Sequence, residues 1–273
     1  MISLPIAVVD TGAGGLSVVQ AVRRLLPGED VHYYADTANL PYGIKSPELI
    51  HRLAIAMAKK VQEISPCKVF VIACHTISVW CLKDIEQTVG LPVVGMVEPS
   101  LIGLSQLIKS GNVASIGILS TPATLRSGVY RNAWPSLDAL GQVRLVEQGS
   151  GMLVSLVEEG EMSEREQVFI LNHILTDAIK QVDAVLMGCT HFSALRSALA
   201  EVLKPNCQII DAADLTALAV ASVLRELPTC RNTKNIGQLI VHVSDNQERF
   251  ANVAHRFLEE KLSINLFGNR HTI

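Results

Sequence analysis

The sequence predicts an α/β protein built from two similar open parallel sheets with flavodoxin-like layering, and three observations support this. Short apolar runs of strand-forming residues alternate with amphipathic stretches along all 273 residues. Such alternation is typical of parallel strands joined by crossover helices. About nine runs qualify as strands, which is many for one open sheet, so two sheets are the simpler account. A short internal repeat also favours two similar sheets.

The expected strands are the short apolar runs, taken in chain order. They lie at residues 6–9, 31–34, 69–72, 92–95, 113–119, 143–146, 184–187, 208–210 and 239–243. The expected helices are the amphipathic stretches between them, whose apolar side would cover a sheet. Clear examples lie at residues 16–26, 47–64, 166–180 and 215–225.

Two of the expected strands carry the internal repeat. Residues 70–77 read Phe-Val-Ile-Ala-Cys-His-Thr-Ile, and residues 184–191 read Ala-Val-Leu-Met-Gly-Cys-Thr-His. Each run ends a buried strand in a cysteine, Cys74 or Cys189, just before a helix. The two cysteines are separated by about the length of one domain, which fits two similar lobes.

Composition and charge exclude several classes of protein. Hydrophobic residues make up 49% of the chain and charged residues 18%, which suits a globular protein and excludes a disordered one. The net charge is −3 and no expected element gathers Lys or Arg, so no nucleic-acid partner is expected. The longest apolar run, 69–82, contains polar side chains and is too short to span a bilayer, so no membrane association is expected. The start of the chain lacks the pattern of a signal peptide, so the cytoplasm is the expected location.

The six cysteines include no Cys-x-x-Cys pair, so free thiols in a reducing compartment are expected. Cys74 and Cys189 stand out because each ends a strand among polar neighbours. A thiol at a helix N-terminus has a depressed pKa, so part of each is expected to be thiolate near neutral pH. The other four are interpreted as small buried packing residues: Cys67, Cys81, Cys207 and Cys230.

Polar groups follow the expected strands repeatedly, at the edge of the sheets where ligands of open α/β proteins bind. They are Asp10 to Gly15, Asp36, Pro41 to Gly43, Cys74 to Thr76, Ser120 to Thr124, Cys189 to His191, and Asp211. So many such groups are hard to explain by turn chemistry alone.

Two of these segments have two interpretations each. The turn from Asp10 to Gly15 matches neither the dinucleotide pattern nor the P-loop. Its backbone N–H groups could hold a carboxylate, or Asp10 could cap the next helix. Thr121 and Pro122 form a typical helix start, for which capping is the favoured role, although such a start also binds anions.

The pair of cysteines indicates a specific chemistry. A single cysteine at a strand end is more often buried packing, but two facing thiols can remove a proton from one face of a carbon and return one to the other. The ordinary thiol pKa of about 8.5 suits both the acid and the base. A zinc site is the alternative, with a Cys₂His₂ set whose spacing is closer than zinc ligands usually have: Cys74, His75, Cys189 and His191.

Taken in order, seven short motifs resemble those of the glutamate racemases in the aspartate/glutamate racemase family. They lie at residues 10–16, 36–43, 73–78, 98–100, 121–124, 156–160 and 188–191, and cover nearly the whole chain. Each motif is weak alone, whereas the ordered set is highly specific.

The resemblance implies two α/β lobes with the active site between them, the first formed by residues 1–97 and 211–273 and the second by 98–210. It implies that Cys74 and Cys189 are the two acid/bases, with Asp10 beside the first thiol and with His191 and Glu158 near the second. The other motif positions would hold glutamate: Thr11, Pro41, Tyr42, Gly43, His75, Thr76 and Thr190. No cofactor or metal would be used, D-glutamate would supply peptidoglycan synthesis, and a homodimer is expected.

Three positions depart from the family pattern. Thr11 replaces a serine and keeps the hydroxyl, whereas His75 replaces an asparagine and changes both shape and hydrogen bonding. Gly149 to Gly151 stand where the family usually has a Cys-Pro segment. Two other functions therefore stay open: an aspartate or broad-range amino-acid racemase, and a binding protein with the racemase fold and low activity.

Overall fold

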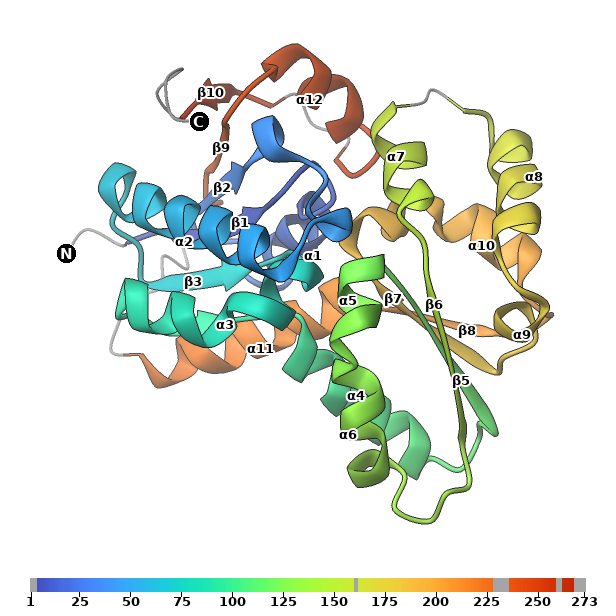
Figure 1. Cartoon of the computed structure of the whole chain (residues 1–273). Coiled ribbons are helices and arrows are strands. Elements are labelled where there is room, and N and C mark those ends of the chain that lie inside the picture. The colour runs from blue at the N-terminus through green and yellow to red at the C-terminus, as the bar shows by residue number, and fades with distance from the viewer. Residues whose placement is uncertain (1–3, 160–161, 228–235, 259–261, 268–273) are drawn as a thin grey trace.

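Two parallel sheets, each covered by helices, make up the protein in a computed structural model (Figure 1). The structure describes residues 4–159, 162–227, 236–258 and 262–267. We call the larger sheet with its helices the six-stranded half, and the smaller sheet with its helices the four-stranded half. The predicted α/β class with two open parallel sheets is confirmed.

The six-stranded sheet has the order β10-β9-β2-β1-β3-β4, and all neighbouring strands are parallel. Its strands are β1 (Ile6–Asp10), β2 (Val31–Ala35), β3 (Val69–Ile72), β4 (Val93–Val94), β9 (Leu239–Val243) and β10 (Ile264–Leu266). The four-stranded sheet has the order β6-β5-β7-β8 and is also parallel. Its strands are β5 (Ser115–Ser120), β6 (Arg144–Gly149), β7 (Ala184–Gly188) and β8 (Gln208–Asp211).

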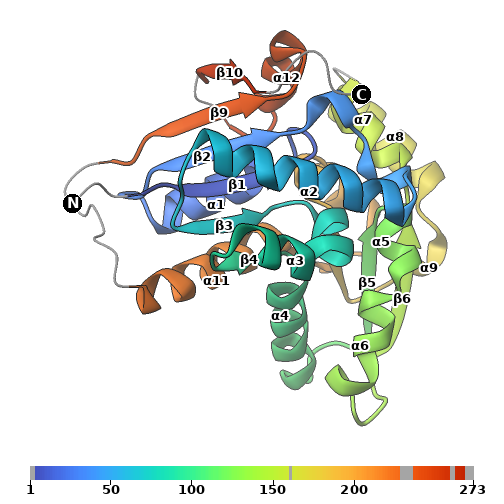
Figure 2. The same cartoon turned by 60° about the vertical axis from the view of Figure 1, so that its left-hand side comes forward.

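Helices cover both faces of the six-stranded sheet. Those of this half are α1 (Leu16–Leu25), α2 (Pro47–Ile64), α3 (His75–Val89), α11 (Ala212–Glu226) and α12 (Gln247–Ala254), with short 3₁₀ turns η1 (Thr37–Asn39) and η2 (Tyr42–Ile44). Figure 2 shows α2 and α3 together on one face of the sheet. Alternate residues of β1 point to opposite faces, so Ala7 and Val9 pack with α2 and α3, while Ile6 and Val8 pack with α1 and α11.

The four-stranded half contains the remaining helices, and its apolar core is continuous with that beneath α1 and α11. They are α4 (Val97–Lys109), α5 (Pro122–Ser127), α6 (Val129–Leu137), α7 (Met152–Glu159), α8 (Glu164–Ile174), α9 (Asp177–Lys180) and α10 (Arg196–Val202), with the 3₁₀ turn η3 (Thr190–Leu195). The chain enters this half through α4 and leaves it through α11, and these two helices pack together.

All nine expected strands are present. The tenth, β10, was not predicted because it has only three residues, and among the described strands it pairs with β9 alone, at the sheet edge. The prediction of one helix over 166–180 is wrong, because the segment forms α8 and α9 with a break between them. Thr176 causes the break: its hydroxyl caps α9 by accepting the N–H of Ile179 and also donates to Gln148.

Two of the four cysteines predicted as packing residues are confirmed. Cys67 and Cys81 are buried free thiols, whereas Cys207 is partly exposed, so its prediction as a buried residue is wrong. Cys207 lies just before β8, at an edge of the small sheet that leaves it incompletely covered. Cys230 lies outside the described residues.

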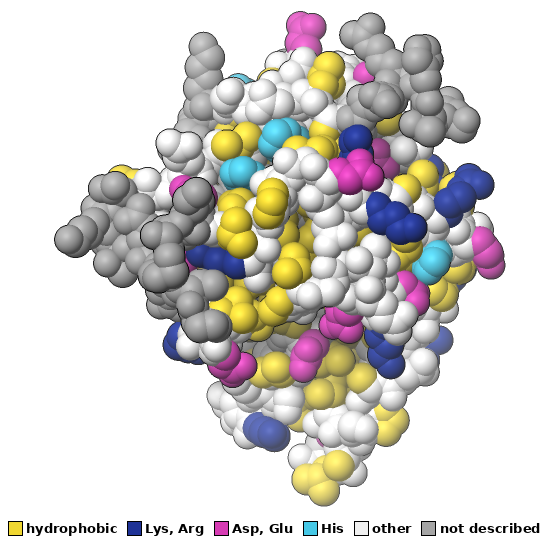
Figure 3. Space-filling view, turned by 90° about the vertical axis from the view of Figure 1, so that its left-hand side faces the viewer, with side chains coloured by type: hydrophobic (Ala, Val, Ile, Leu, Met, Phe, Trp, Pro, Cys, Tyr) yellow, Lys and Arg dark blue, Asp and Glu magenta, His cyan; other side chains and the backbone are white. Residues whose placement is uncertain are grey.

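The surface of the six-stranded half fits the small net charge. On the face turned away from the four-stranded half, acidic and basic side chains are scattered among polar and apolar ones rather than gathered by sign (Figure 3). The described residues of that face therefore form no basic stripe of the kind that binds nucleic acid. Among the described residues, no helix has the length and apolar character needed to cross a membrane.

A buried ion pair at the base of the six-stranded sheet is expected to be sensitive to mutation. Lys68 Nζ donates to Glu29 Oε2, and the two side chains are only 2% and 3% exposed. We predict that Lys68→Met, which leaves Glu29 buried without its cation, lowers the free energy of unfolding by about 3–5 kcal/mol in urea denaturation. The double variant Lys68→Met/Glu29→Gln should recover much of this loss.

The control is the exposed pair of Lys60 and Glu63, whose Nζ and Oε2 lie 3.2 Å apart. Lys60→Met should change stability by about 0–1 kcal/mol. A Lys68 variant no less stable than the Lys60 variant would contradict the prediction.

Candidate active site

The turn after β1 uses its backbone to hold two carboxylates of the protein itself. Asp10 ends β1 with no exposed surface, and its Oδ1 accepts the N–H of Thr11 at 2.7 Å. The N–H of Ala13 donates to Glu158 Oε1 of α7 at 3.2 Å. Helix α1 begins after Gly15 without a side-chain cap, so Asp10 does not cap it. The glycine-rich turn is thus a cradle for carboxylates, and the two described here come from different halves.

Cys74 occupies the N-cap position of α3, directly after β3, and is 7% exposed. Burial and the neighbouring Asp10 carboxylate raise the pKa of its thiol well above the ordinary value. The prediction of a depressed pKa is therefore wrong for Cys74. The helix N-terminus does favour the thiolate through the backbone of Ile77, but desolvation and the negative neighbour outweigh it.

Cys189 has a different set of neighbours, supplied by η3 and α7. Its Sγ lies 3.9 Å from His191 Nδ1, and His191 Nε2 lies 2.6 Å from Glu158 Oε1. Burial alone would lower the pKa of His191, but the hydrogen bonds and charges of Cys189 and Glu158 raise it well above the ordinary value. Burial favours a neutral Glu158, yet its bond to His191 gives a net lowering of its pKa. An imidazolium thus stands between a thiol group and a carboxylate.

A hydrogen bond between side chains joins the surroundings of the two cysteines. Thr190 Oγ1, beside Cys189, donates to Asp10 Oδ2 at 3.2 Å, and Asp10 in turn neighbours Cys74. Gly14 permits this close approach, since a Cβ there would lie 2.5 Å from His191 Nδ1 and 2.7 Å from the His191 backbone nitrogen. Any larger residue at position 14 would push η3 away from the turn.

His75 is buried in the same region without a hydrogen-bond partner. Its side chain is 2% exposed, and within the described part of the chain neither ring nitrogen has a partner. Burial lowers the pKa of the imidazole to about 3, so the ring is neutral at physiological pH. Two unpaired nitrogens in a buried ring are costly, so His75 has hydrogen-bonding capacity that the described protein groups leave unused.

The segment from Pro41 to Gly43 is held by a hydrogen bond to Asp36 and lies against the four-stranded half. Tyr42 is buried, and its hydroxyl donates to Asp36 Oδ2 at 2.6 Å. A Cβ on Gly43 would lie 2.6 Å from the Cβ of Thr121, so this backbone passes directly against the start of α5.

One small cavity brings the predicted residues together. Eleven of the twelve predicted site residues line it, and the exception is Glu158, which lies behind His191. Its volume is about 20 Å³, enough for little more than one water molecule. The site is therefore closed to an amino acid as it stands, and the cavity would have to widen before a substrate could reach the thiols.

Two residues that line the cavity were not predicted as site residues, namely Thr121 and Val154. Thr121 does cap α5, as its sequence predicts, by accepting the N–H of Thr124 at 3.2 Å. Its hydroxyl also lies 3.0 Å from that of Thr76, across the boundary between the halves. The anion-binding role left open for this helix start was the available signal for Thr121. Val154 is an ordinary apolar helix residue, and no signal marks it.

The lining is unusual in its charges. Its residues include no lysine or arginine, so a carboxylate inside would depend on hydroxyls, backbone N–H groups and the two histidines, His75 and His191. Among the described residues, no group of three or more His, Cys, Asp or Glu is arranged to hold a metal ion. The zinc alternative has no support from this geometry.

The two buried histidines should titrate in opposite senses. We predict that, in NMR spectra of protein labelled in its histidine rings, His191 keeps its proton to a higher pH than an ordinary imidazole, while His75, whose pKa is lowered to about 3, stays neutral at about pH 5. Glu158→Gln should lower the pKa of His191, because burial then acts without the opposing carboxylate. Single His→Asn variants assign the two signals, and a His191 that titrates near 6.5 in the parent would refute the charge assignment.

Comparisons with known proteins fit this geometry. The sequence model of the Asp/Glu/Hydantoin racemase family matches residues 6–220. Glutamate racemase of Geobacter metallireducens is 33% identical over 259 residues, covering 94% of this chain and 93% of that protein. Glutamate racemase of Thermus thermophilus is 34% identical over 259 residues, covering 93% of each.

Solved structures agree over nearly the full length. Glutamate racemase from Francisella tularensis in complex with D-glutamate superposes with a TM-score of 0.85 at 26% identity and covers 98% of both chains. Glutamate racemase from Thermus thermophilus in complex with β-chloro-D-alanine gives a TM-score of 0.80 at 32% identity, covering 97% of this chain and 96% of that one. On the extent of these matches, the chain belongs to the Asp/Glu/hydantoin racemase family.

Proposed function

We propose that this protein interconverts L- and D-glutamate without a cofactor. The observation that carries the proposal is the pair of buried thiols, Cys74 and Cys189, which come from different sheets and line one cavity. The substrate assignment rests on the relatives from Geobacter and Thermus, which are glutamate racemases, and on the Francisella structure, which contains D-glutamate.

In the proposed reaction, the Cys189 thiolate takes the α-proton of L-glutamate, and the electron pair of the broken Cα–H bond is held by the α-carboxylate as an enediolate. The Cys74 thiol then delivers its proton to the opposite face, which gives D-glutamate and leaves Cys74 as thiolate. The reverse reaction starts from that thiolate. One proton leaves the substrate and one arrives, so the step needs no oxidant, reductant or metal.

The neighbours of each thiol support this division of roles. The His191 imidazolium, held by Glu158, would stabilise the Cys189 thiolate. Asp10, whose pKa burial raises, would keep the Cys74 thiol protonated until the carbanion forms.

The residues proposed to hold glutamate supply hydrogen-bond groups without a positive charge. They are Thr11, Pro41, Tyr42, Gly43, His75, Thr76 and Thr190, all of which line the cavity. The N–H groups at the start of α3 would favour a carboxylate, because the positive end of its helix dipole points there.

Three wider features belong to the same proposal. D-glutamate would supply peptidoglycan synthesis, and the protein would act in the cytoplasm as a homodimer. The lobes would comprise residues 1–97 with 211–273, and residues 98–210, a division supported by the membership of the strands in two sheets.

The direct test is circular dichroism of L- and D-glutamate solutions with purified protein. We predict that both enantiomers relax to the racemate after exhaustive dialysis against a chelator and without pyridoxal phosphate. The same assay with L- and D-aspartate distinguishes a broad-range or aspartate racemase. Activity that disappears on dialysis and returns with zinc or pyridoxal phosphate would falsify the two-thiol proposal, and no turnover at all would favour a binding protein.

The two thiols should be specific for opposite faces of the substrate. We predict that Cys74→Ser and Cys189→Ser each lower kcat by about 10²–10⁴-fold, because a serine hydroxyl is a poor base without help. With a glutamate analogue that carries a β leaving group, each variant should still eliminate from one enantiomer, and the two variants should prefer opposite enantiomers.

The control for these substitutions is Cys207→Ser, since Cys207 is partly exposed and lies outside the cavity. It should keep the activity of the parent. Equal loss on both enantiomers of the analogue in both cysteine variants would contradict two opposed bases.

A further inference from the structure

A second cavity lies directly outside the closed site. It has a volume of about 320 Å³, which is large enough for an amino acid, and it opens to solvent. It shares Pro41 and Val154 with the inner cavity, and Glu158 also reaches it. Pro41 of the six-stranded half and Val154 of α7 in the four-stranded half thus border both spaces.

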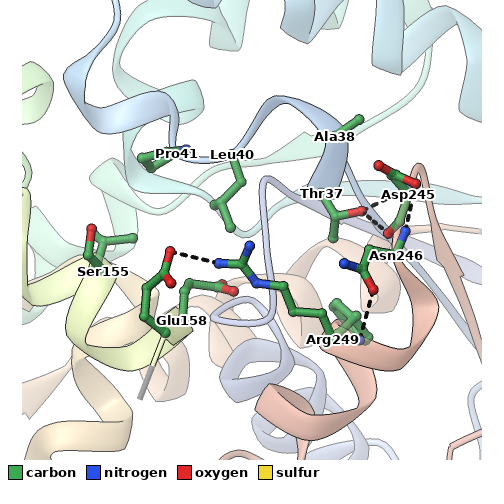
Figure 4. A pocket seen from close by; sticks show the side chains of 12 residues that line it. Thr37, Ala38, Leu40, Pro41, Ser155, Glu158, Asp245, Asn246 and Arg249 are labelled. Atoms are coloured by element: carbon green, nitrogen blue, oxygen red, sulfur yellow. Dashed lines mark hydrogen bonds and ion pairs between the residues drawn. The ribbon is translucent and has the colours of Figure 1, made fainter.

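Arg249 supplies a guanidinium, a group that the lining of the inner cavity lacks. Figure 4 shows its side chain extending from α12 across the outer cavity toward α7. There its Nη2 lies 2.9 Å from Oε1 of Glu159. The two side chains are 49% and 69% exposed, so the ion pair is solvated and is held only weakly. A guanidinium binds carboxylates through two parallel N–H groups, so an incoming carboxylate can replace Glu159 on it.

Other polar groups of the outer cavity fit the rest of an amino dicarboxylate. Asp245 and the displaced Glu159 are carboxylates on the same cavity and would accept the α-ammonium group. Asn246 uses its side-chain oxygen to accept the N–H of Arg249, which leaves its amide NH₂ as a donor (Figure 4). Arg249 and the Asn246 amide would thus face the two carboxylates of the substrate, and the acidic side chains of the cavity would face its ammonium group.

We propose that this outer cavity is a separate binding site for the amino dicarboxylate substrate, which is occupied before the inner site. Here Arg249 exchanges Glu159 for a carboxylate of the substrate. The substrate then moves inward when Pro41 and Val154 separate. This inference rests on the proposed racemase function, because it concerns the path of the same substrate to the thiols.

The exchange gives the exposed ion pair of Glu159 and Arg249 a function besides linking the two halves. Glu159 and Arg249 belong to the two different halves, so breaking the pair also releases one of the contacts that keep the halves together. A substrate carboxylate that takes the place of Glu159 would therefore be bound and would favour opening at the same time. An ion pair with a purely structural role, which we call a brace, would link the halves without any preference for a carboxylate ligand.

The rate of substrate association tests this inference. Trp80 of α3 donates to the carbonyl oxygen of Ala123 in α5 at 3.3 Å, so its fluorescence should report separation of the halves. The other tryptophan, Trp134, bonds to Val143 within the four-stranded half and is replaced by Phe. Stopped-flow mixing with L-glutamate is done in the Cys74→Ser/Cys189→Ser background, where binding occurs without turnover.

The two ends of the ion pair should behave in opposite ways. Arg249→Gln should slow association by about three- to ten-fold and remove most of its dependence on salt, because the guiding cation is gone. Glu159→Gln should speed association by a few fold, since Arg249 is then free to take the substrate. Dissociation should change by the same factor as association, because the inner site is unaltered.

If Arg249→Gln and Glu159→Gln change association in the same direction, the pair is only a brace and the outer site is refuted. The parent protein separates this failure from that of the proposed function. Turnover of glutamate by the parent, combined with parallel behaviour of the two variants, rejects the outer site alone. Absence of both turnover and glutamate binding in the parent rejects the racemase proposal itself.

Discussion

The contact between the turn after β1 and the four-stranded half is the constraint on which the candidate site depends. Asp10 accepts from Thr190, and Ala13 donates to Glu158, so one short turn fixes both the segment after Cys189 and the carboxylate behind His191. The absence of a side chain at Gly14 lets His191 approach this turn. If this contact opened, the two cysteines would no longer share a cavity, and neither half contains a second thiol at the corresponding place in the described residues.

Burial in this contact acts on different ionisable groups near the two cysteines. At Cys74 it acts together with the Asp10 carboxylate, and both favour the neutral thiol. Beside Cys189 the same low-dielectric surroundings strengthen the attraction between the His191 imidazolium and its negative neighbours. The asymmetry suits a relay in which one thiol starts as acid and the other as base. It arises from which charged side chain each half contributes, rather than from the two strand-end motifs, which are alike.

Much of the fold and the site was predictable because both are encoded in local patterns. The alternation of apolar runs gave nine strands, and the ordered motifs gave eleven residues of one cavity. The thiol pKa was mispredicted for Cys74 because the sequence shows its place at a helix start but not the depth of burial or the distance to Asp10. Val154 and β10 left no signal, since a helix residue and a three-residue edge strand become informative only when their partners in space are known.

The positive charges near the site are divided between two places, and this division affects how the substrate and the carbanion are stabilised. A fixed arginine inside a water-free cavity would bind a dicarboxylate strongly, but it would also favour the α-carboxylate of the ground state and the enediolate alike. The inner lining instead relies on neutral donors beside His191, whose charge is already shared between Glu158 and the Cys189 thiol group. The solvated cation, Arg249, lies outside, where binding is weak and exchange is fast. Capture of the charged substrate and stabilisation of the carbanion would then be carried out by different residues, so that changes to one need not impair the other.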